Sequence, residues 1–248
     1  MNYSRTFRLI FPSFLCLIFL SGTLSAQRSS KRGVRGNGNV IKESREVGNF
    51  HSLDIGGIFE VVLRQGNGTS LEIEADENLM EYIEVRESGN TLEVSLRKGI
   101  NLKEYEEMNL YISMDEVETL SLSGMVSLKG ETQIQGDEIV IDHGGMGTTD
   151  LDLFANKLEA NIHGMSKLKL EGKVNQVFLD NSGMGSIHAE DLKATRLTID
   201  NSGMGNADVY ATTEIDISSS GMGKVTYSGE AEVKSVHSSG MAKVKRKK

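Results

Sequence analysis

The tripeptide Gly-Met-Gly and its close variants recur through the second half of the chain. Each methionine follows a glycine, and successive methionines are 18 to 21 residues apart. A period near 20 with strand-like flanks is typical of a solenoid, in which each repeat buries its apolar side by stacking on its neighbours. The sequence therefore predicts seven stacked coils. Their methionines are Met125, Met146, Met165, Met184, Met204, Met222 and Met241.

The residues around each methionine alternate between apolar and polar. Five positions before the methionine and three after it, the residues are almost all apolar, as Leu179 and Ile187 are around Met184. Four positions before it the residue is always polar, as Asp180 is. A period of two indicates strands with one buried face. We expect each Gly-Met-Gly to be a corner between two strands, where glycine supplies the backbone freedom that a sharp bend needs.

The first 26 residues have the pattern of a secretory signal peptide. Arg5 and Arg8 precede an apolar run from Leu9 to Leu20, and small residues end the segment at Ala26. We predict cleavage after Ala26 and export to the periplasm, the outer surface or the medium. A membrane span is disfavoured because the uninterrupted apolar run is shorter than the ~20 residues that a spanning helix needs. No later segment has the length and apolar character of a span.

Loss of the signal peptide would leave a chain without Cys, Pro or Trp, because Cys16 and Pro12 both lie within it. Small exported domains often depend on disulfides. This chain must instead depend on a long continuous core and on backbone hydrogen bonds. Residues 36–242 carry a net charge of −19, which argues against nucleic acid as a partner. Basic residues gather in a predicted flexible leader, 27–39, and in a tail, 245–248.

Residues 40–115 form a predicted N-terminal β portion in which the repeat is not visible. Apolar and polar residues alternate here over longer stretches, and Asp76 to Tyr82 is the one segment with the pattern of a helical turn. The predicted solenoid of seven coils follows over residues 116–244. The chain is therefore predicted to be all-β, with coils of about 20 residues after a less regular β part.

Three features resemble the head GIN domain family, whose members are also called putative auto-transporter adhesins. They are the segment 54–63 (DIGGIFEVVL), the segment 74–80 (EADENLM) and the series of Ser-Gly-x-Gly corners. The likeness covers about Val40 to Val244. It implies a right-handed parallel β-helix of the pectin-lyase kind, exported by Gram-negative bacteria and without an established activity. This chain departs from the family pattern in placing Met where the corner more often has Ser.

Two aspartates in one polar column raise the hypothesis of a glycan-cleaving enzyme. Asp180 and Asp200 each lie four positions before a methionine, and adjacent coils set backbones ~4.8 Å apart, close to the ~5 to 5.5 Å carboxylate pair of a retaining glycosidase. Any polar column of a solenoid has this spacing, however, and this one continues as Asn161 and Ser218. A lyase would need a basic residue beside a bound cation, and Arg196 is the only arginine among the coils before the tail. We predict no catalytic residues.

Metal binding is a second hypothesis. The glycine-rich nonapeptide of calcium-binding β-rolls needs Asp at a fixed offset after each glycine, and only Asp150 and Asp208 come close. Copper ligands must converge on one point, whereas one Met per coil forms a line. The histidines do not share one column, so we predict no metal site and no cofactor. The aspartates considered are Asp142, Asp150, Asp152, Asp180, Asp200, Asp208 and Asp216, and the histidines are His143, His163, His188 and His237.

Two asparagines lie three positions before a methionine, on the inward side by parity. They are Asn181 and Asn201. Stacked β structures hold such residues in ladders, in which the amides hydrogen-bond to one another along the axis. We expect a structural ladder here rather than a functional site.

Parity places the methionines on the outside. Counted alternately from the buried column, the positions one and three before and after each methionine fall inside, and the methionine falls outside. The core is the ordinary place for Met, and a corner can break parity, so both positions stay open. Exposed thioethers would form a flexible apolar stripe suited to an adaptable partner surface. The candidate binding residues are Met146, Met165, Met184, Met204 and Met222.

The sequence favours a non-catalytic, adhesin-like module that binds a partner through one side of the solenoid. Long regular faces make good binding surfaces, and no set of residues has the composition of an active site. We expect the partner to be a protein or another cell-surface ligand, and the oligomeric state stays open. The alternatives are a structural protein of the cell envelope and a polysaccharide-cleaving enzyme on a pectin-lyase-like fold.

Overall fold

The computed structural model describes residues 33–66 and 68–247. The predicted signal peptide, 1–26, and residues 27–32 of the predicted leader lie outside the described residues. The described chain is nearly all β, with one short 3₁₀ helix, η1 (Glu77–Tyr82), inside the segment where the sequence predicts a helical turn. None of the helical structure described is long and apolar enough to cross a membrane.

The second half of the described chain forms stacked parallel coils. Its strands are β9 (Thr119–Gly130), β10 (Ile134–His143), β11 (Met146–Ile162), β12 (Met165–Asn181), β13 (Ser186–Asn201), β14 (Ala207–Ser219), β15 (Lys224–Ser228), β16 (Glu232–Ser238) and β17 (Lys243–Arg246). Equivalent residues of successive coils lie opposite each other, as Met146 lies opposite Met165. The coils have about 19 residues each and make about 7 turns, so the predicted β-solenoid is confirmed.

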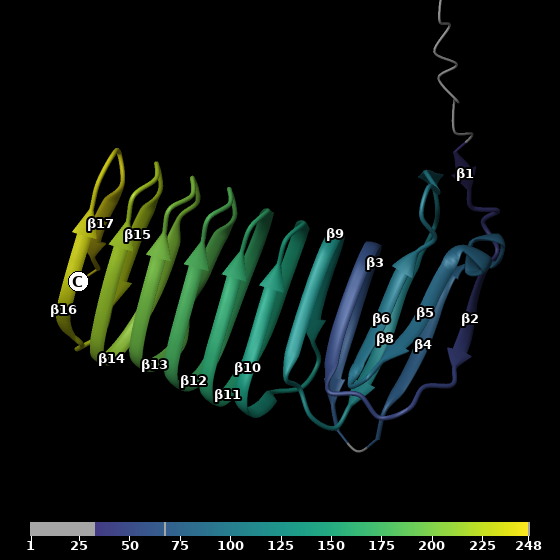
Figure 1. The fold of residues 1–248 in the computed structure, drawn as a ribbon, viewed down its shortest axis with the longest axis horizontal. Coiled ribbons are helices and arrows are strands. Elements are labelled where there is room, and N and C mark those ends of the chain that lie inside the picture. Colours follow the sequence, from purple (N-terminus) through teal and green to yellow (C-terminus); the bar gives the residue numbers. More distant parts are fainter. Residues whose placement is uncertain (1–32, 67, 248) are drawn as a thin grey trace, which may run out of the picture. The chain divides into compact units, whose positions relative to one another are not determined.

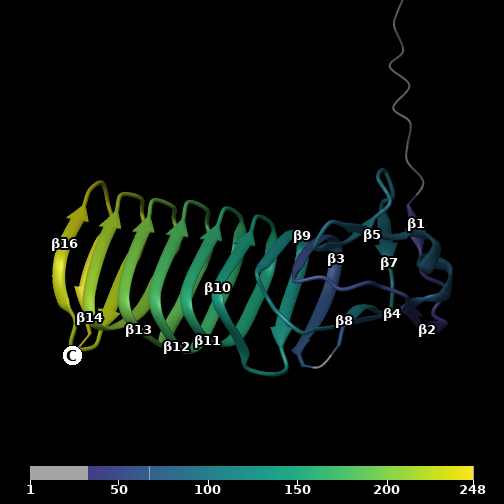
Figure 2. The same ribbon diagram turned by 60° about the horizontal axis from the view of Figure 1, so that its bottom comes forward.

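The Gly-Met-Gly segments lie at one edge of this stack. β11 passes through a whole coil, because its first part pairs with β9 and its last part pairs with β10. The short loops that follow β12, β13 and β14 contain the next Gly-Met pairs, and the loop after β11 contains Gly164, with Met165 as the first residue of β12. These loops lie in a row along the upper edge of the molecule in both views (Figures 1 and 2). The repeat of the sequence therefore becomes a straight edge of the fold.

One coil was not visible in the sequence. Strand β3 (Ser52–Gln65) pairs in parallel with β9, and this register sets Gly57 opposite Gly124 and Ile58 opposite Met125. The sequence analysis included it in the irregular portion, 40–115, because a long segment separates it from β9 and isoleucine replaces methionine. The edge of the solenoid thus begins one coil earlier than predicted.

Most of the remaining N-terminal strands continue the sheet beyond β3. The remaining strands are β1 (Val34–Arg35), β2 (Val40–Arg45), β4 (Ser70–Asp76), β5 (Ile83–Ser88), β6 (Thr91–Leu96), β7 (Leu102–Glu104) and β8 (Met108–Met114). β6 and β8 pair with β3 in parallel, whereas β4 pairs with β8 and β2 in antiparallel fashion. β5 pairs with β6 in antiparallel fashion, whereas β1 and β7 pair in parallel and form a separate two-stranded sheet.

Part of the predicted flexible leader, 27–39, is held against this region. Asp76 is completely buried, and its carboxylate accepts hydrogen bonds from the backbone N–H groups of Gly38 (2.7 Å) and Glu106 (2.8 Å). A buried carboxylate with two such partners ties two loops to the end of β4. Residues 33–39 are therefore not a free arm, which corrects that prediction for the described part of the leader.

A continuous apolar core runs through the stack. The inward columns of the sequence analysis are buried, as Leu179 and Ile199 are, while Asp200 between the columns is exposed. Two polar residues, His143 and Thr149, occupy inward positions, and His143 Nδ1 lies 3.0 Å from Thr149 Oγ1. Burial lowers the pKa of His143, so this ring is neutral at physiological pH. The predicted alternation is confirmed.

The corner glycines are required by close stacking more than by backbone freedom. The backbone N–H of Met204 donates to the carbonyl of Gly183 (3.0 Å), and the N–H of Met222 donates to that of Gly203 (3.1 Å). A Cβ atom added at Gly203 would overlap the carbonyl oxygen of Gly183 in the preceding coil. Its φ angle, however, is not in the left-handed region. The sequence analysis gave conformational freedom as the reason for glycine, and at this position that reason is wrong.

The predicted asparagine ladder is present inside the stack. Asn181 and Asn201 are fully buried, and the Asn181 amide donates to Asn201 Oδ1 at 2.8 Å. Each side chain also donates to a corner carbonyl of its own coil, that of Gly185 (3.0 Å) and that of Gly205 (3.1 Å). The ladder therefore satisfies carbonyl groups at the corner and links two coils.

We predict that Gly203→Ala destabilises the protein by about 3 kcal/mol, because the new methyl group must displace the neighbouring backbone. Gly144→Ala is the matched control, since the nearest non-neighbour atom to its added Cβ is the Leu122 carbonyl oxygen at 3.9 Å and its φ is ordinary. We expect that change to be neutral or slightly stabilising. Denaturant unfolding measures both, and equal losses would contradict the close-stacking account.

We predict that Asn201→Ala costs about 3 kcal/mol, because it leaves buried polar partners of Asn201 without a hydrogen bond. Asn175→Ala removes a similar amide–amide bond, from Asn175 Nδ2 to Asn156 Oδ1 (3.1 Å), at an exposed position. Water replaces that bond, so we expect a cost below about 0.5 kcal/mol. Thermal unfolding of the two variants compares them, and an exposed variant as unstable as the buried one would refute the role given to the ladder.

Candidate functional site

The seven methionines of the repeats form an exposed row, which we call the methionine ridge. Each leaves between 41% and 66% of its surface accessible, whereas Met80, Met108 and Met114 are at most 6% exposed. The ridge methionines project outward because the residues on both sides of them turn inward or stack on the neighbouring coil. The prediction that they face solvent is confirmed, and their role in binding stays a prediction. The ridge comprises Met125, Met146, Met165, Met184, Met204, Met222 and Met241.

A shallow groove of about 560 Å³ runs beside the ridge. Its floor is made of the glycines that precede the methionines, and we call it the glycine groove. The methionines form one wall, and the residues two positions before them form the other. Because the floor has no side chains, the groove is continuous from coil to coil. It is lined by His163, Gly164, Met165, Ser182, Gly183, Met184, Ser202, Gly203, Met204, Gly221 and Met222.

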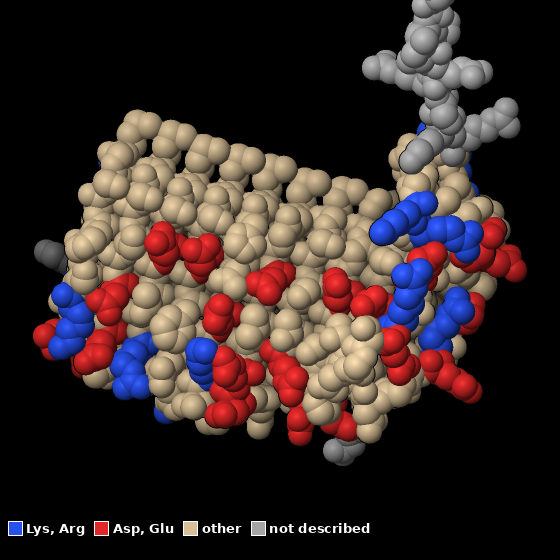
Figure 3. All heavy atoms as spheres, viewed as in Figure 1, with Lys and Arg blue, Asp and Glu red and all other residues tan. Residues whose placement is uncertain are grey.

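The ridge and the groove carry no Asp, Glu, Lys or Arg. In Figure 3 the upper edge of the coils is uncoloured, and the red and blue side chains lie on the face below it. His163 is the titratable residue of the groove, and its Nδ1 lies 2.8 Å from Ser182 Oγ. An exposed apolar strip on a body with a net charge of −19 is a candidate interaction surface.

The two aspartates of the enzyme hypothesis lie next to this edge. Asp180 and Asp200 are register partners in β12 and β13. Burial raises the pKa of Asp180, the nearby Asp200 carboxylate raises it further, and His163 and Ser182 oppose the rise. Neither aspartate lines the glycine groove. Burial, and then the like charge on the adjacent coil, explain the direction of this shift. The same column holds Asn161, which donates to Asp142 at 2.8 Å. The side chains four positions before the methionines therefore contact one another from coil to coil along a polar column.

Two histidines have carboxylates near them that the sequence analysis did not connect with them. His188, Glu190 and Asp208 each have a donor atom within 4.8 Å of those of the other two. Glu190 follows His188 by two residues and shares its strand face, and the register of β13 and β14 sets Asp208 opposite His188. Because acidic side chains are abundant on this protein, the proximity of two carboxylates to His188 does not by itself indicate a cation site.

The other histidine is His51. It pairs with Glu116 (3.5 Å) and Glu118 (3.6 Å) at the start of the stack. Side-chain exposure is 70% for Glu116 and 55% for Glu118, so these ion pairs lie in solvent and contribute little. These contacts link the segment that precedes β3, which contains His51, to the segment that precedes β9, which contains Glu116 and Glu118.

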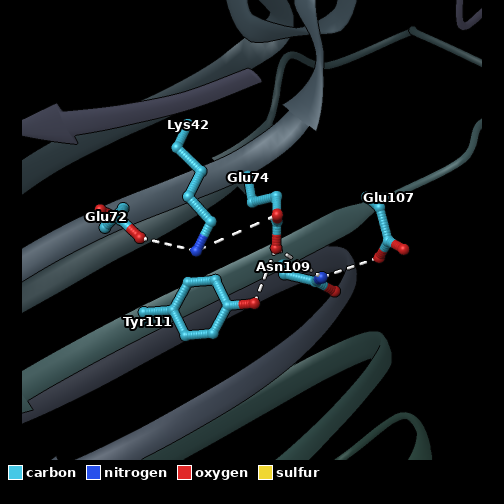
Figure 4. Close-up of polar contacts among 6 residues, drawn as sticks. All are labelled: Lys42, Glu72, Glu74, Glu107, Asn109 and Tyr111. Atoms are coloured by element: carbon cyan, nitrogen blue, oxygen red, sulfur yellow. Dashed lines mark hydrogen bonds and ion pairs between the residues drawn. The ribbon is translucent and has the colours of Figure 1, made fainter. Parts of the chain in front are cut away.

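A polar network crosses the N-terminal strands β2, β4 and β8 (Figure 4). Lys42 Nζ lies 3.0 Å from Glu72 and 4.2 Å from the centre of the Tyr111 ring. Tyr111 donates to Glu74 at 2.7 Å, and Asn109 donates to the same carboxylate at 3.1 Å. The sequence did not single out these residues, because they come from three strands that only the register brings together.

This network satisfies its own charges. The hydrogen bonds from Tyr111 and then Asn109 lower the pKa of Glu74, and the bond to Glu74 raises the pKa of Tyr111. The bond to Glu72 raises the pKa of Lys42. All three groups therefore keep their ordinary charge states at neutral pH, and the network fits a role in holding β2, β4 and β8 together. The methionine ridge with its groove is the better candidate for a binding site.

Several solved structures share this fold. A putative adhesin from Bacteroides fragilis is 26% identical, with a TM-score of 0.84 over 87% of this chain and 100% of that one. A structure described as a putative lipid binding protein from Parabacteroides distasonis is 19% identical (TM-score 0.69; 88% and 100% covered). A putative adhesin from the same organism is 20% identical (TM-score 0.66; 87% and 100%).

None of the curated proteins compared with the chain matches it. A family match covers residues 49–231, which include β3, the N-terminal strands β4 to β8 and all the coils up to β15. The segments 54–63 and 74–80, which carry the resemblance in the sequence, both lie inside this range. The chain belongs to the family described as "putative auto-transporter adhesin, head GIN domain".

Proposed function

We propose that this chain is an exported, non-catalytic adhesin-like module that binds its partner through the methionine ridge and the glycine groove. The family name and the adhesin from Bacteroides fragilis support the adhesin-like role. The signal-peptide pattern of residues 1–26 supports export. The observation that carries the proposal is the uncharged strip of exposed thioethers along one straight edge.

The physical properties of the ridge suit a binding surface. Methionine side chains are unbranched and polarizable, so they adapt their shape to a partner. The stacked corners beneath them are rigid, because the backbone N–H groups of Met184, Met204 and Met222 are each hydrogen-bonded to the preceding coil. A flexible apolar layer on a rigid support gains contact area on binding without reorganisation of the backbone. The binding residues proposed are Met146, Met165, Met184, Met204 and Met222.

Two other functions have less support. A structural protein of the cell envelope needs no exposed apolar edge, so the ridge would be unexplained. A polysaccharide-cleaving enzyme would use Asp180 and Asp200, and its acid would need a raised pKa, which Asp180 has. The described surroundings of the pair, however, are polar residues of the same column rather than a substrate-sized groove with a third catalytic group.

We predict that a variant with all five methionines changed to serine loses at least tenfold in binding, since each substitution removes apolar contact area. Beads coated with the protein are tested for retention on surfaces coated with acidic polysaccharides, neutral polysaccharides, extracellular proteins or the protein itself. Released sugar products are measured in the same wells. The variant should unfold within a few degrees of the wild type, because the side chains are exposed.

Phe154→Ser with Phe178→Ser is the matched control, because these side chains are 54% and 39% exposed and lie outside the ridge. This double variant should be retained like the wild type. Equal retention of the serine ridge variant, or no retention of the wild type on any surface, would refute the proposal. Sugar release that disappears in Asp180→Asn would favour the enzyme instead.

A further inference from the structure

The ridge and the groove lie side by side and have the same repeat. Both are generated by the coils, so one methionine and one floor glycine occur in every coil, with the ~4.8 Å spacing of neighbouring strands. The groove is lined by residues that precede the methionines, and the residues that follow them, such as Gly185 and Gly205, are buried. The edge is therefore asymmetric, with a groove on one side of the ridge over the four coils from Met165 to Met222.

An occupant of the groove must match this repeat to fill it. An extended peptide lying along the groove advances ~3.3 Å per residue, so its side chains fall out of step with the coils. A second methionine ridge has the same spacing as the groove by construction. Stacked β structures form dry interfaces in the same way, by interdigitating side chains that repeat with the same spacing on both surfaces.

Symmetry then fixes how two copies can meet. A two-fold axis parallel to the solenoid axis, midway between ridge and groove, places the ridge of each copy in the groove of the other. Such an interface is isologous and closes as a dimer. The two solenoids point the same way, and every coil faces its own equivalent. A two-fold axis across the edge would instead set ridge against ridge and leave both grooves empty.

Charges at the margins of the edge favour the same arrangement. Lys167 and Lys224 lie two positions after a methionine, on the side away from the groove. The parallel two-fold axis turns that side of one copy towards the polar column of the other. Lys167 and Lys224 then lie opposite Asn161 and Ser218 of the equivalent coils. The aspartates of that column, Asp142, Asp180 and Asp200, are one coil away from them. The contact zone itself is uncharged, so two acidic bodies meet along the part of this edge where repulsion is least.

From this geometry we infer that the partner of the methionine ridge is a second copy of this chain, paired side by side in the same direction. The inference rests on the proposed function and names its partner. The strip is narrow and roughly 34 Å long over seven coils. Interfaces that bury less than about 1,200 Å² in total are typical of weak complexes, so the dimer forms at high local concentration, as on a surface.

Single cysteines test both the pairing and its direction. Met146→Cys, Met184→Cys and Met222→Cys are made in a Cys16→Ser background, so that each chain holds one cysteine. The proteins are oxidised mildly at about 100 µM, within the range of a weak complex. All three should form disulfide-linked dimers at similar rates, because every coil faces its own equivalent. Phe154→Cys, which is equally exposed elsewhere, should cross-link at least tenfold more slowly.

Sedimentation of the wild-type protein gives a measurement that needs no cysteine. Its dimerisation should weaken at least tenfold in Met184→Ser with Met204→Ser. Cross-linking of Met184→Cys alone would overturn the parallel arrangement, since an antiparallel pair aligns only the central coil with itself. Monomers at all concentrations, or equal cross-linking of Phe154→Cys, would overturn self-association. Retention of the beads on another coated surface would then leave the proposed function standing with a different partner.

Discussion

The structure depends on the hydrogen bonds that join each corner to the corner before it. The backbone N–H of a methionine donates to the carbonyl of the glycine that precedes the methionine one coil earlier, as Met184 does to Gly164 at 2.9 Å. This contact brings the two backbones so close that a Cβ at the glycine position would overlap the earlier carbonyl. The glycine is therefore fixed by its neighbour coil. With both flanking positions stacked or buried, the methionine side chain has only the solvent side to occupy.

The same contact explains how the chain confines its exposed thioethers to one line. The charged side chains visible in Figure 3 lie on the face below that line. Inside the corner, the asparagine pair Asn181 and Asn201 satisfies carbonyl groups that the bend would otherwise leave unpaired. Buried amides, stacked backbone and exposed thioethers thus form successive layers from the core to the methionine ridge.

Periodic features could be predicted from the sequence, and features that break the period could not. The spacing of the repeats and the alternation of apolar and polar residues were enough to predict the parallel coils, the buried columns, the Asn181–Asn201 ladder and the exposure of the ridge. The coil that contains β3 was not recognised, because Ile58 replaces methionine and a long segment separates β3 from β9. The group of His188, Glu190 and Asp208 was not singled out, because the register of β13 and β14 is what sets Asp208 opposite His188. The network around Glu74 depends on antiparallel register among three strands, which no local pattern indicates.

Oxidation footprinting in dilute solution tests the central claim, that the stacked corners force every ridge methionine outward. The protein is treated briefly with hydrogen peroxide, and the sulfoxide at each methionine is measured by mass spectrometry. The seven ridge methionines should oxidise at similar rates, at least tenfold faster than Met80, Met108 and Met114, which are at most 6% exposed. A ridge methionine as slow as Met114, or a uniform rate across all ten, would contradict the account.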